Sequence, residues 1–171
     1  DDRLPIGTTV TLGATGTSGV LQLGDSAGAC NQTLAGLGTS GSGGAVVGGN
    51  ANMSTLTIND NSGVTYGPTL GTGDYLGGAA ANQNNLALVK DGTATSTLNG
   101  VNTYAGGTTI RAGTVVWGNN SALGGGTVTL NDSGTGSSAT SLLESGSRTL
   151  SVPIVVANQG SDTTTIGSVS G

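Results

Sequence analysis

The chain has 171 residues and a formal net charge of −5, and this length predicts one domain spanning 1–171. With 34 glycines and only 2% aromatic residues, the composition excludes a globular core filled by Phe and Trp. The four basic residues are scattered along the chain, so there is no electrostatic basis for binding nucleic acid. No apolar run approaches the roughly 20 residues of a membrane-spanning helix, so no membrane span is expected.

Short runs rich in Val, Ile, Leu and Thr alternate with turns of Gly, Asn and Asp along the whole chain. Such runs predict β-strands, and none of them shows the spacing of an amphipathic helix. In chain order the predicted strands are 9–12, 20–23, 32–37, 45–47, 54–58, 64–66, 86–90, 95–98, 108–111, 114–117, 127–130, 141–143, 148–156 and 163–169.

Strands this short, with turns at such regular intervals, predict a chain wound as a coil in which each turn pairs with the next. The expected fold is therefore all-β, a right-handed parallel β-helix or β-solenoid of roughly seven coils spaced about 4.8 Å apart. A β-sandwich is the alternative, because many short strands fit that class as well. Residues 70–85 carry no strand pattern and are predicted to form an excursion from the solenoid.

The segment 86–130 contains the most regular of these runs and is predicted to be the repeat core. Within it, 102–115 reads Asn-Thr-Tyr-Ala-Gly-Gly-Thr-Thr-Ile-Arg-Ala-Gly-Thr-Val. This string resembles the autotransporter-associated β-strand repeat, also called the passenger-associated transport repeat. The positions that follow the family pattern are Lys90, Gly92, Leu98, Gly100, Asn102, Thr103, Tyr104, Gly106, Gly107, Thr108, Thr109, Gly113 and Thr114.

The sequence departs from the family pattern at Thr93-Ala94-Thr95, where Gly-x-Gly-Thr is preferred, and at Val115, where Leu is preferred. The resemblance implies a parallel β-helix in very large secreted proteins of the bacterial cell surface, and it implies no catalytic residue. An extracellular location follows from the same resemblance. Tyr104 lies on the family signature and is expected to be a packing or corner residue.

The titratable side chains give little support to catalysis. The absence of His excludes a Ser/His triad, an imidazole base and His-ligated metals. The aspartates at 25, 60, 91 and 132 lie in Gly-, Asn- and Ser-rich turns and are interpreted as turn formers. The lone Cys30 is expected to be a small buried side chain, with an intermolecular bridge or a reactive thiol as the alternative. We expect no enzyme and no cofactor, and a carbohydrate-active enzyme is the least favoured class.

The two ends of a solenoid expose unpaired backbone groups, which natural proteins usually protect with a cap, charges or Pro. Residues 1–12 can be aligned with 119–130 without a gap, so the end of the chain is expected to resemble its beginning. Such ends would suit subunits that stack head to tail, or a segment between flanking repeats of a larger chain. The candidate contact residues are Thr9, Val10, Thr11, Leu12, Thr163, Thr165, Ile166 and Val169.

The function expected from these features is structural, as a building block of a surface fibre or stalk. The alternatives are an adhesin passenger segment and a module that binds ice or glycan through threonines. Pairs of the form Thr-x-Thr occur at 9/11, 55/57, 127/129 and 163/165. Strand alternation would place both hydroxyls of a pair on the same face.

Overall fold

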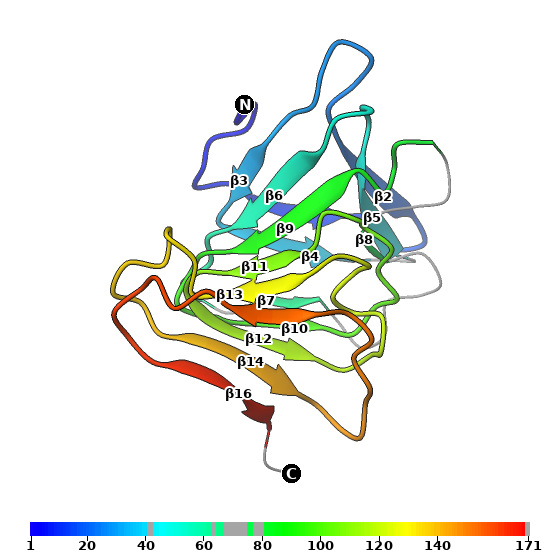
Figure 1. Ribbon diagram of the computed structural model, residues 1–171. Coiled ribbons are helices and arrows are strands. Elements are labelled where there is room, and N and C mark those ends of the chain that lie inside the picture. The colour runs from blue at the N-terminus through cyan, green and yellow to red at the C-terminus, as the bar shows by residue number, and fades with distance from the viewer. Residues whose placement is uncertain (41–42, 63, 67–74, 77–80, 170–171) are drawn as a thin grey trace.

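The computed structural model describes residues 1–171 apart from 41–42, 63, 67–74, 77–80 and 170–171 (Figure 1). The described residues form strands and turns, and no helix is found among them, so the chain is all-β as predicted. The strands are β1 (Thr9–Leu12), β2 (Ser18–Leu23), β3 (Gln32–Leu34), β4 (Gly36–Thr39), β5 (Gly43–Gly48), β6 (Ser54–Ile58), β7 (Val64–Tyr66), β8 (Tyr75–Leu76), β9 (Leu86–Lys90), β10 (Thr95–Leu98), β11 (Thr108–Ile110), β12 (Gly113–Trp117), β13 (Val128–Leu130), β14 (Thr140–Glu144), β15 (Ile154–Val156) and β16 (Thr164–Ser168).

The strands pair in parallel within four sheets. A six-stranded sheet has the order β15-β13-β11-β9-β6-β3, and a five-stranded sheet has the order β16-β14-β12-β10-β7. From β9 onward, successive strands alternate between these two sheets, which lie one in front of the other (Figure 1). We call one strand of the six-stranded sheet, together with the strands that follow it before the chain returns to that sheet, a rung. Parallel stacking of rungs is consistent with a β-solenoid, whereas an immunoglobulin-type sandwich pairs its strands antiparallel.

Two smaller sheets complete the N-terminal part of the molecule. Strand β1 pairs with β4, and β2, β5 and β8 form a three-stranded sheet, again with parallel pairs. Strand β4 follows β3 in its rung as β10 follows β9, and it lies against β7. Strand β2, which precedes the first rung, and strands β5 and β8 of the first two rungs therefore form a third sheet to which β9–β16 do not contribute.

Two predicted strands differ from the structure for identifiable reasons. The run 32–37 is two strands, β3 and β4, because the chain bends at Ala35, whose N–H donates to the carbonyl of Thr8 rather than continuing the β3 ladder. The run 148–156 forms a strand only over its last three residues. Pro153 has no N–H to donate, and the strand begins directly after it.

The core lies between the six- and five-stranded sheets and is built from columns of inward side chains. One column of the six-stranded sheet joins Leu34, Ile58, Lys90, Ile110, Leu130 and Val156 in register. Its aliphatic members from Leu34 to Leu130 are at most 1% exposed. A thin core of this kind needs no large aromatic side chains, which agrees with the composition.

Lys90 interrupts that apolar column with a charge. Its Nζ lies 2.8 Å from Asp60 Oδ1, and the two side chains are only 2% and 1% exposed. The ammonium also donates to the carbonyls of Gly92 and Ala112, and Ser96 Oγ donates to Asp60 Oδ2 at 3.0 Å. Burial of an ion pair is tolerated when the remaining polar atoms are hydrogen-bonded in this way. Asp60 is thus a core residue rather than only the turn former that the sequence suggests.

The predicted excursion at 70–85 falls largely on residues outside the described part of the chain. Within it, Tyr75–Leu76 forms β8, which pairs with β5.

The resemblance between 1–12 and 119–130 is not a structural repeat. Its first half ends in β1, which pairs with β4, whereas its second half ends in β13 of the six-stranded sheet. Both segments read Thr-Val-Thr-Leu, and both bury the final Leu. The shared string therefore reflects the alternation common to half-buried strands, not an equivalent place in the fold.

Candidate functional site: the two terminal edges

The C-terminal rung ends both large sheets. Strand β15 pairs only with β13, and β16 pairs only with β14, so each has one free edge among the described residues. Neither strand carries a charged side chain, since β15 reads Ile-Val-Val and β16 reads Thr-Thr-Ile-Gly-Ser. Pro153, directly before β15, is of a residue type that discourages a further strand from pairing at a sheet edge.

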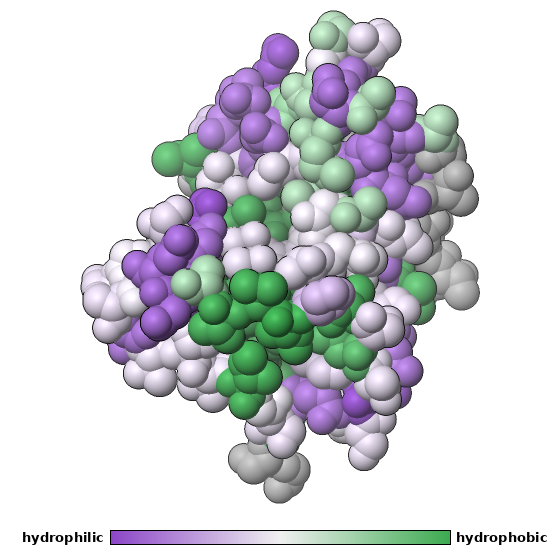
Figure 2. Space-filling model, in the orientation of Figure 1, coloured by the Kyte–Doolittle hydropathy of each residue, from purple (hydrophilic) through white to green (hydrophobic). Residues whose placement is uncertain are grey.

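Inward positions of this rung are exposed, although their partners in the preceding rung are buried. Ile154 and Val156 are 40% and 44% exposed, and they stand in register with Val128 and Leu130, which are 0% exposed. In the other sheet, Ile166 is 51% exposed beside Leu142 at 1%. Figure 2 shows a hydrophobic patch where Figure 1 places β15. The C-terminal end of the core is therefore open.

The N-terminal end buries several apolar side chains, although β1 and β2 each keep one free edge among the described residues. Leu12 and Leu23 are 8% and 3% exposed, and Leu4 packs against the same core cluster. These inward leucines, which precede the first rung, are thus better covered than Ile154 and Val156 at the C-terminal end.

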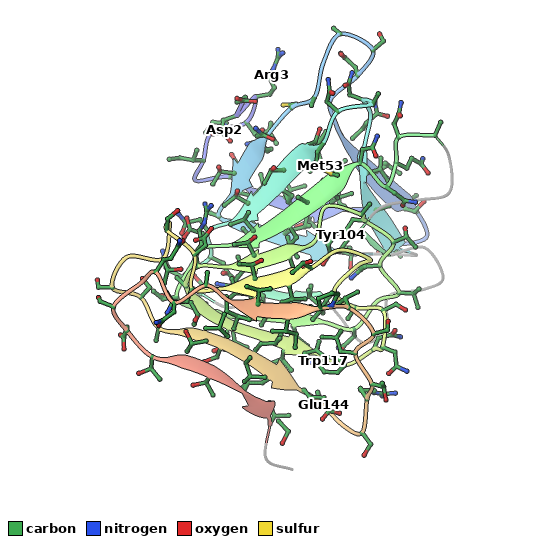
Figure 3. All side chains as sticks on the ribbon, viewed as in Figure 1. Asp2, Arg3, Met53, Tyr104, Trp117 and Glu144 are labelled. Carbon is green, nitrogen blue, oxygen red and sulfur yellow. The ribbon has the colours of Figure 1, made fainter. Side chains whose placement is uncertain are left out.

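At the first edge of the six-stranded sheet, two carboxylates accept hydrogen bonds from backbone N–H groups. Asp2 Oδ1 accepts the backbone N–H of Thr33 in β3 at 2.5 Å, and Asp1 Oδ1 accepts the N–H of Asn31 at 3.2 Å. The Asp2 N–H donates to the Asn31 carbonyl at 2.8 Å, with Asp2 in the left-handed region at φ 43°. Figure 3 shows Asp2 and Arg3 beside β3. Asp1 and Asp2 thus cap the first edge of the six-stranded sheet directly.

The eight contact residues predicted from the sequence lie at opposite ends of the molecule. In β1, Thr9 and Thr11 are exposed, Val10 is half-buried and Leu12 is buried. Of the C-terminal set, Thr165 and Ile166 lie in the free-edged β16, Thr163 precedes it, and Val169 follows it. The Val169 N–H donates to the carbonyl of Glu144, which continues the β14–β16 pairing by one residue.

The sequence analysis did not single out β15 as part of the terminal edge. Ile154, Val155 and Val156 are 40%, 46% and 44% exposed and form the free edge of the six-stranded sheet. The available signal was three consecutive β-branched residues after Pro153, near the end of the chain. Reading 148–156 as one long strand concealed it.

No group of three or more His, Cys, Asp or Glu able to hold a metal ion occurs among the described residues. Cys30 is half-buried rather than fully buried, and it lines a hollow of about 500 Å³ together with Arg3, Gln22 and Asp25. Across the described ranges, no helix is long and apolar enough to span a membrane.

The Thr-x-Thr pairs do not share one face. The pairs at 55/57 and 127/129 belong to the six-stranded sheet or its margin, whereas 9/11 lies in β1 and 163/165 at β16. A different column does form on the six-stranded sheet, where Thr33, Thr57, Val89, Thr109, Thr129 and Val155 stand in register. Its threonines are half-buried, and Val89 interrupts the hydroxyls.

Residues of the string 102–115, which carries the family resemblance, form close contacts within and between adjacent rungs. Tyr104 is completely buried, and its hydroxyl lies 2.5 Å from Thr108 Oγ1. Burial raises the pKa of Tyr104 above its ordinary value, and the hydrogen bond to Thr108 opposes that change. Gly107 adopts φ +78°, and a side chain there would overlap the carbonyl of Thr127 in the next rung. Tyr104 is therefore a packing residue, as predicted.

Comparison with known protein families places a passenger-associated-transport-repeat at residues 88–116. This match confirms the resemblance drawn from the sequence, and it covers β10 and β11 with most of β9 and β12. Comparison with curated proteins and with solved structures found no match.

Proposed function

We propose that the chain is a non-catalytic structural segment of an extracellular bacterial surface protein, a right-handed β-solenoid that extends a fibre or stalk end to end. The passenger-associated-transport-repeat at 88–116 supports a passenger region as its setting. Parallel pairing with alternation between two sheets supports the solenoid. Right-handedness follows the rule that nearly all crossovers between parallel strands of one sheet have that hand.

The observation that carries the proposal is the difference in side-chain exposure between β13 and its paired strand β15. Val128 and Leu130 are fully buried because β15 lies on β13, whereas Ile154 and Val156 remain about half exposed beside a free strand edge. A further rung placed on β15 and β16 would bury these side chains and pair the free backbone groups. That rung could be supplied by a flanking repeat of a larger chain or by a neighbouring copy stacked head to tail.

Electron microscopy and sedimentation of the purified chain test end-to-end extension. We expect the mean particle length to increase with protein concentration. The variant Ile166→Lys places a charge on the terminal rung and should abolish the increase, whereas Val101→Lys, at a residue 57% exposed between β10 and β11, should retain it. Monomers at every concentration would contradict end-to-end stacking between copies.

The threonine column of the six-stranded sheet favours a second candidate function, binding of ice or a crystalline glycan. Parallel strands space its hydroxyls regularly, about 4.8 Å per rung where rungs are adjacent. Thr57→Lys and Thr109→Lys should abolish such binding, while Thr114→Lys on β12, in the other sheet, should not. Ice-recrystallisation and glycan-array assays measure it, and activity that survives both column variants would contradict this candidate.

A further inference from the structure

We propose that the buried side chains of Lys90 and Asp60 condense into an intramolecular isopeptide bond, a covalent amide that joins consecutive rungs. Lys90 is the last residue of β9, and Asp60 lies two residues beyond the end of β6, the strand with which β9 pairs. The pair lies in the core, and its reaction does not depend on the proposed function.

The surroundings of the pair favour the two neutral groups from which an amide forms. Lys90 Nζ lies 2.8 Å from Asp60 Oδ1, and the two side chains are 2% and 1% exposed. In the column of inward residues, Lys90 stands between Ile58 and Ile110, both at most 1% exposed. Burial penalises the charged forms of both groups. Transfer of one proton from the ammonium to the carboxylate removes both charges and leaves an amine beside a carboxylic acid.

The hydrogen bonds of the ammonium direct the amine toward the acid. Nζ donates to the carbonyls of Gly92 and Ala112, so two of its three N–H groups have backbone acceptors. The third is left for Asp60, and loss of that proton places the nitrogen lone pair on the same side. Among the described residues, Asp60 Oδ1 accepts no hydrogen bond of normal geometry. This oxygen is therefore the one that can leave.

The condensation releases one water and needs no other reactant. After the ammonium proton has passed to Oδ1, the neutral Nζ attacks the carboxyl carbon Cγ, and negative charge develops on Oδ2. Ser96 Oγ donates to Oδ2 at 3.0 Å, which stabilises that charge. A second proton then passes from Nζ to the Oδ1 hydroxyl. The Cγ–Oδ1 bond breaks, water departs, and the new Nζ–Cγ bond remains as the amide.

The reaction is slow, because the two partners must exchange their protons without help. No hydrogen bond or ion pair links either of them to a second carboxylate among the described residues, and the chain contains no His. A separate general acid or base would accelerate such transfers by about 10²–10⁴-fold. The ion pair is therefore the state of the freshly folded chain, and the amide accumulates afterwards. Exclusion of water from the core then protects the amide from hydrolysis.

The amide would change how the chain carries tension. It closes residues 60–90 into a covalent loop that contains β7 and β8. A pulling force would pass directly from Asp60 to Lys90, so the intervening residues could not extend.

Mass spectrometry of the refolded chain provides the test. We expect chain refolded from urea and then incubated to accumulate a species one water lighter, while chain kept in urea retains its full mass. Trypsin cuts after Lys90 only while its amine is free, and the flanking sites are Arg3 and Arg111. The lighter species should therefore yield the peptide 4–111 in place of 4–90 and 91–111.

Two variants and a chemical treatment supply the controls. Arg111→Lys places a lysine beside Asp132, in a pair whose native side chains are 35% and 21% exposed, and it should lose no second water. Ser96→Ala should slow the condensation at least tenfold while circular dichroism shows an unchanged fold. A succinimide at Asp91-Gly92 would also be one water lighter, but mild alkali reopens a succinimide and leaves an amide intact.

A folded chain that keeps its full mass after prolonged incubation would overturn the proposal, as would a lighter species that alkali restores to full mass. Equal water loss in urea, or a second water lost as readily from Arg111→Lys, would show that burial is not required and would also overturn it. An unchanged rate in Ser96→Ala would refute the role of that hydroxyl.

Discussion

The buried pair between Lys90 and Asp60 predicts a large loss of stability when only one partner is removed. In Lys90→Met, the apolar column from Ile58 to Ile110 becomes continuous, which by itself is favourable. Asp60, however, stays 1% exposed, and the hydroxyl of Ser96 is the one side-chain hydrogen-bond donor left to it among the described residues. The net effect is therefore set by the unpaired carboxylate and not by the lost lysine.

The magnitude follows from the depth of the pair. Removing one partner of a fully buried ion pair costs about 3–5 kcal/mol, a large share of the roughly 5–15 kcal/mol that stabilises a typical domain. The pair between Arg111 and Asp132 supplies the control, since its closest contact is 3.1 Å but its side chains are 35% and 21% exposed. Arg111→Met should cost no more than about 1 kcal/mol, because solvent screens the pair.

Urea denaturation followed by circular dichroism measures these differences. We expect Lys90→Met to lower the unfolding midpoint markedly, Arg111→Met to change it slightly, and the double variant Lys90→Met with Asp60→Asn to recover most of the loss. The recovery is the decisive result, since it separates an unpaired charge from a packing defect. Equal losses in Lys90→Met and Arg111→Met would refute the reasoning, as would a double variant no more stable than Lys90→Met.

Three further predictions concern the close contacts between rungs. Gly92→Ala should unfold the chain at lower temperature than wild type, because a side chain there would overlap the backbone of Asp60; an unchanged melting temperature would contradict this packing. Burial holds Tyr104 neutral in the fold, so its contribution to stability is complete below about pH 10 and declines as pH rises above the value at which the unfolded phenol ionises. Melting temperatures at pH 8 and pH 11 should therefore differ less in Tyr104→Phe than in wild type. Asp2→Ala should increase amide hydrogen exchange at Thr33, whose N–H loses its acceptor, without affecting β13; unchanged exchange at Thr33 would refute the capping role.

The positions of the strands could be predicted from the sequence because the two-residue alternation is local. The run 54–58, for example, alternates buried and half-buried residues as its Ser-Thr-Leu-Thr-Ile sequence requires. The pairing of rungs is not local, and it decides what each inward position contacts. Lys90 ends a strand of ordinary appearance, and nothing near it in the chain indicates that Asp60 closes over it from the preceding rung.

At the terminal edges, too, local strand positions could be predicted from the sequence, whereas contacts between distant strands could not. Ile166 could be identified from its place in the last predicted strand, but β15 could not, because its exposure depends on which strand lies beside it. The cap at the other end was equally hidden, since Asp1 and Asp2 reach β3 only after the chain has turned back on itself. Terminal surfaces depend on the final stacking order, which local patterns do not encode.

The ammonium of Lys90 joins three successive rungs, through Asp60 before it, Gly92 within its own rung and Ala112 after it. A chain tethered at a cell surface and pulled at its far end would unravel one rung at a time, since each rung contacts only its neighbours. We expect this stepwise unfolding to pause at Lys90, because its ammonium must lose all three contacts before the rung can separate. We therefore expect the length of chain that unfolds first under tension to be set by the position of Lys90 in the stack.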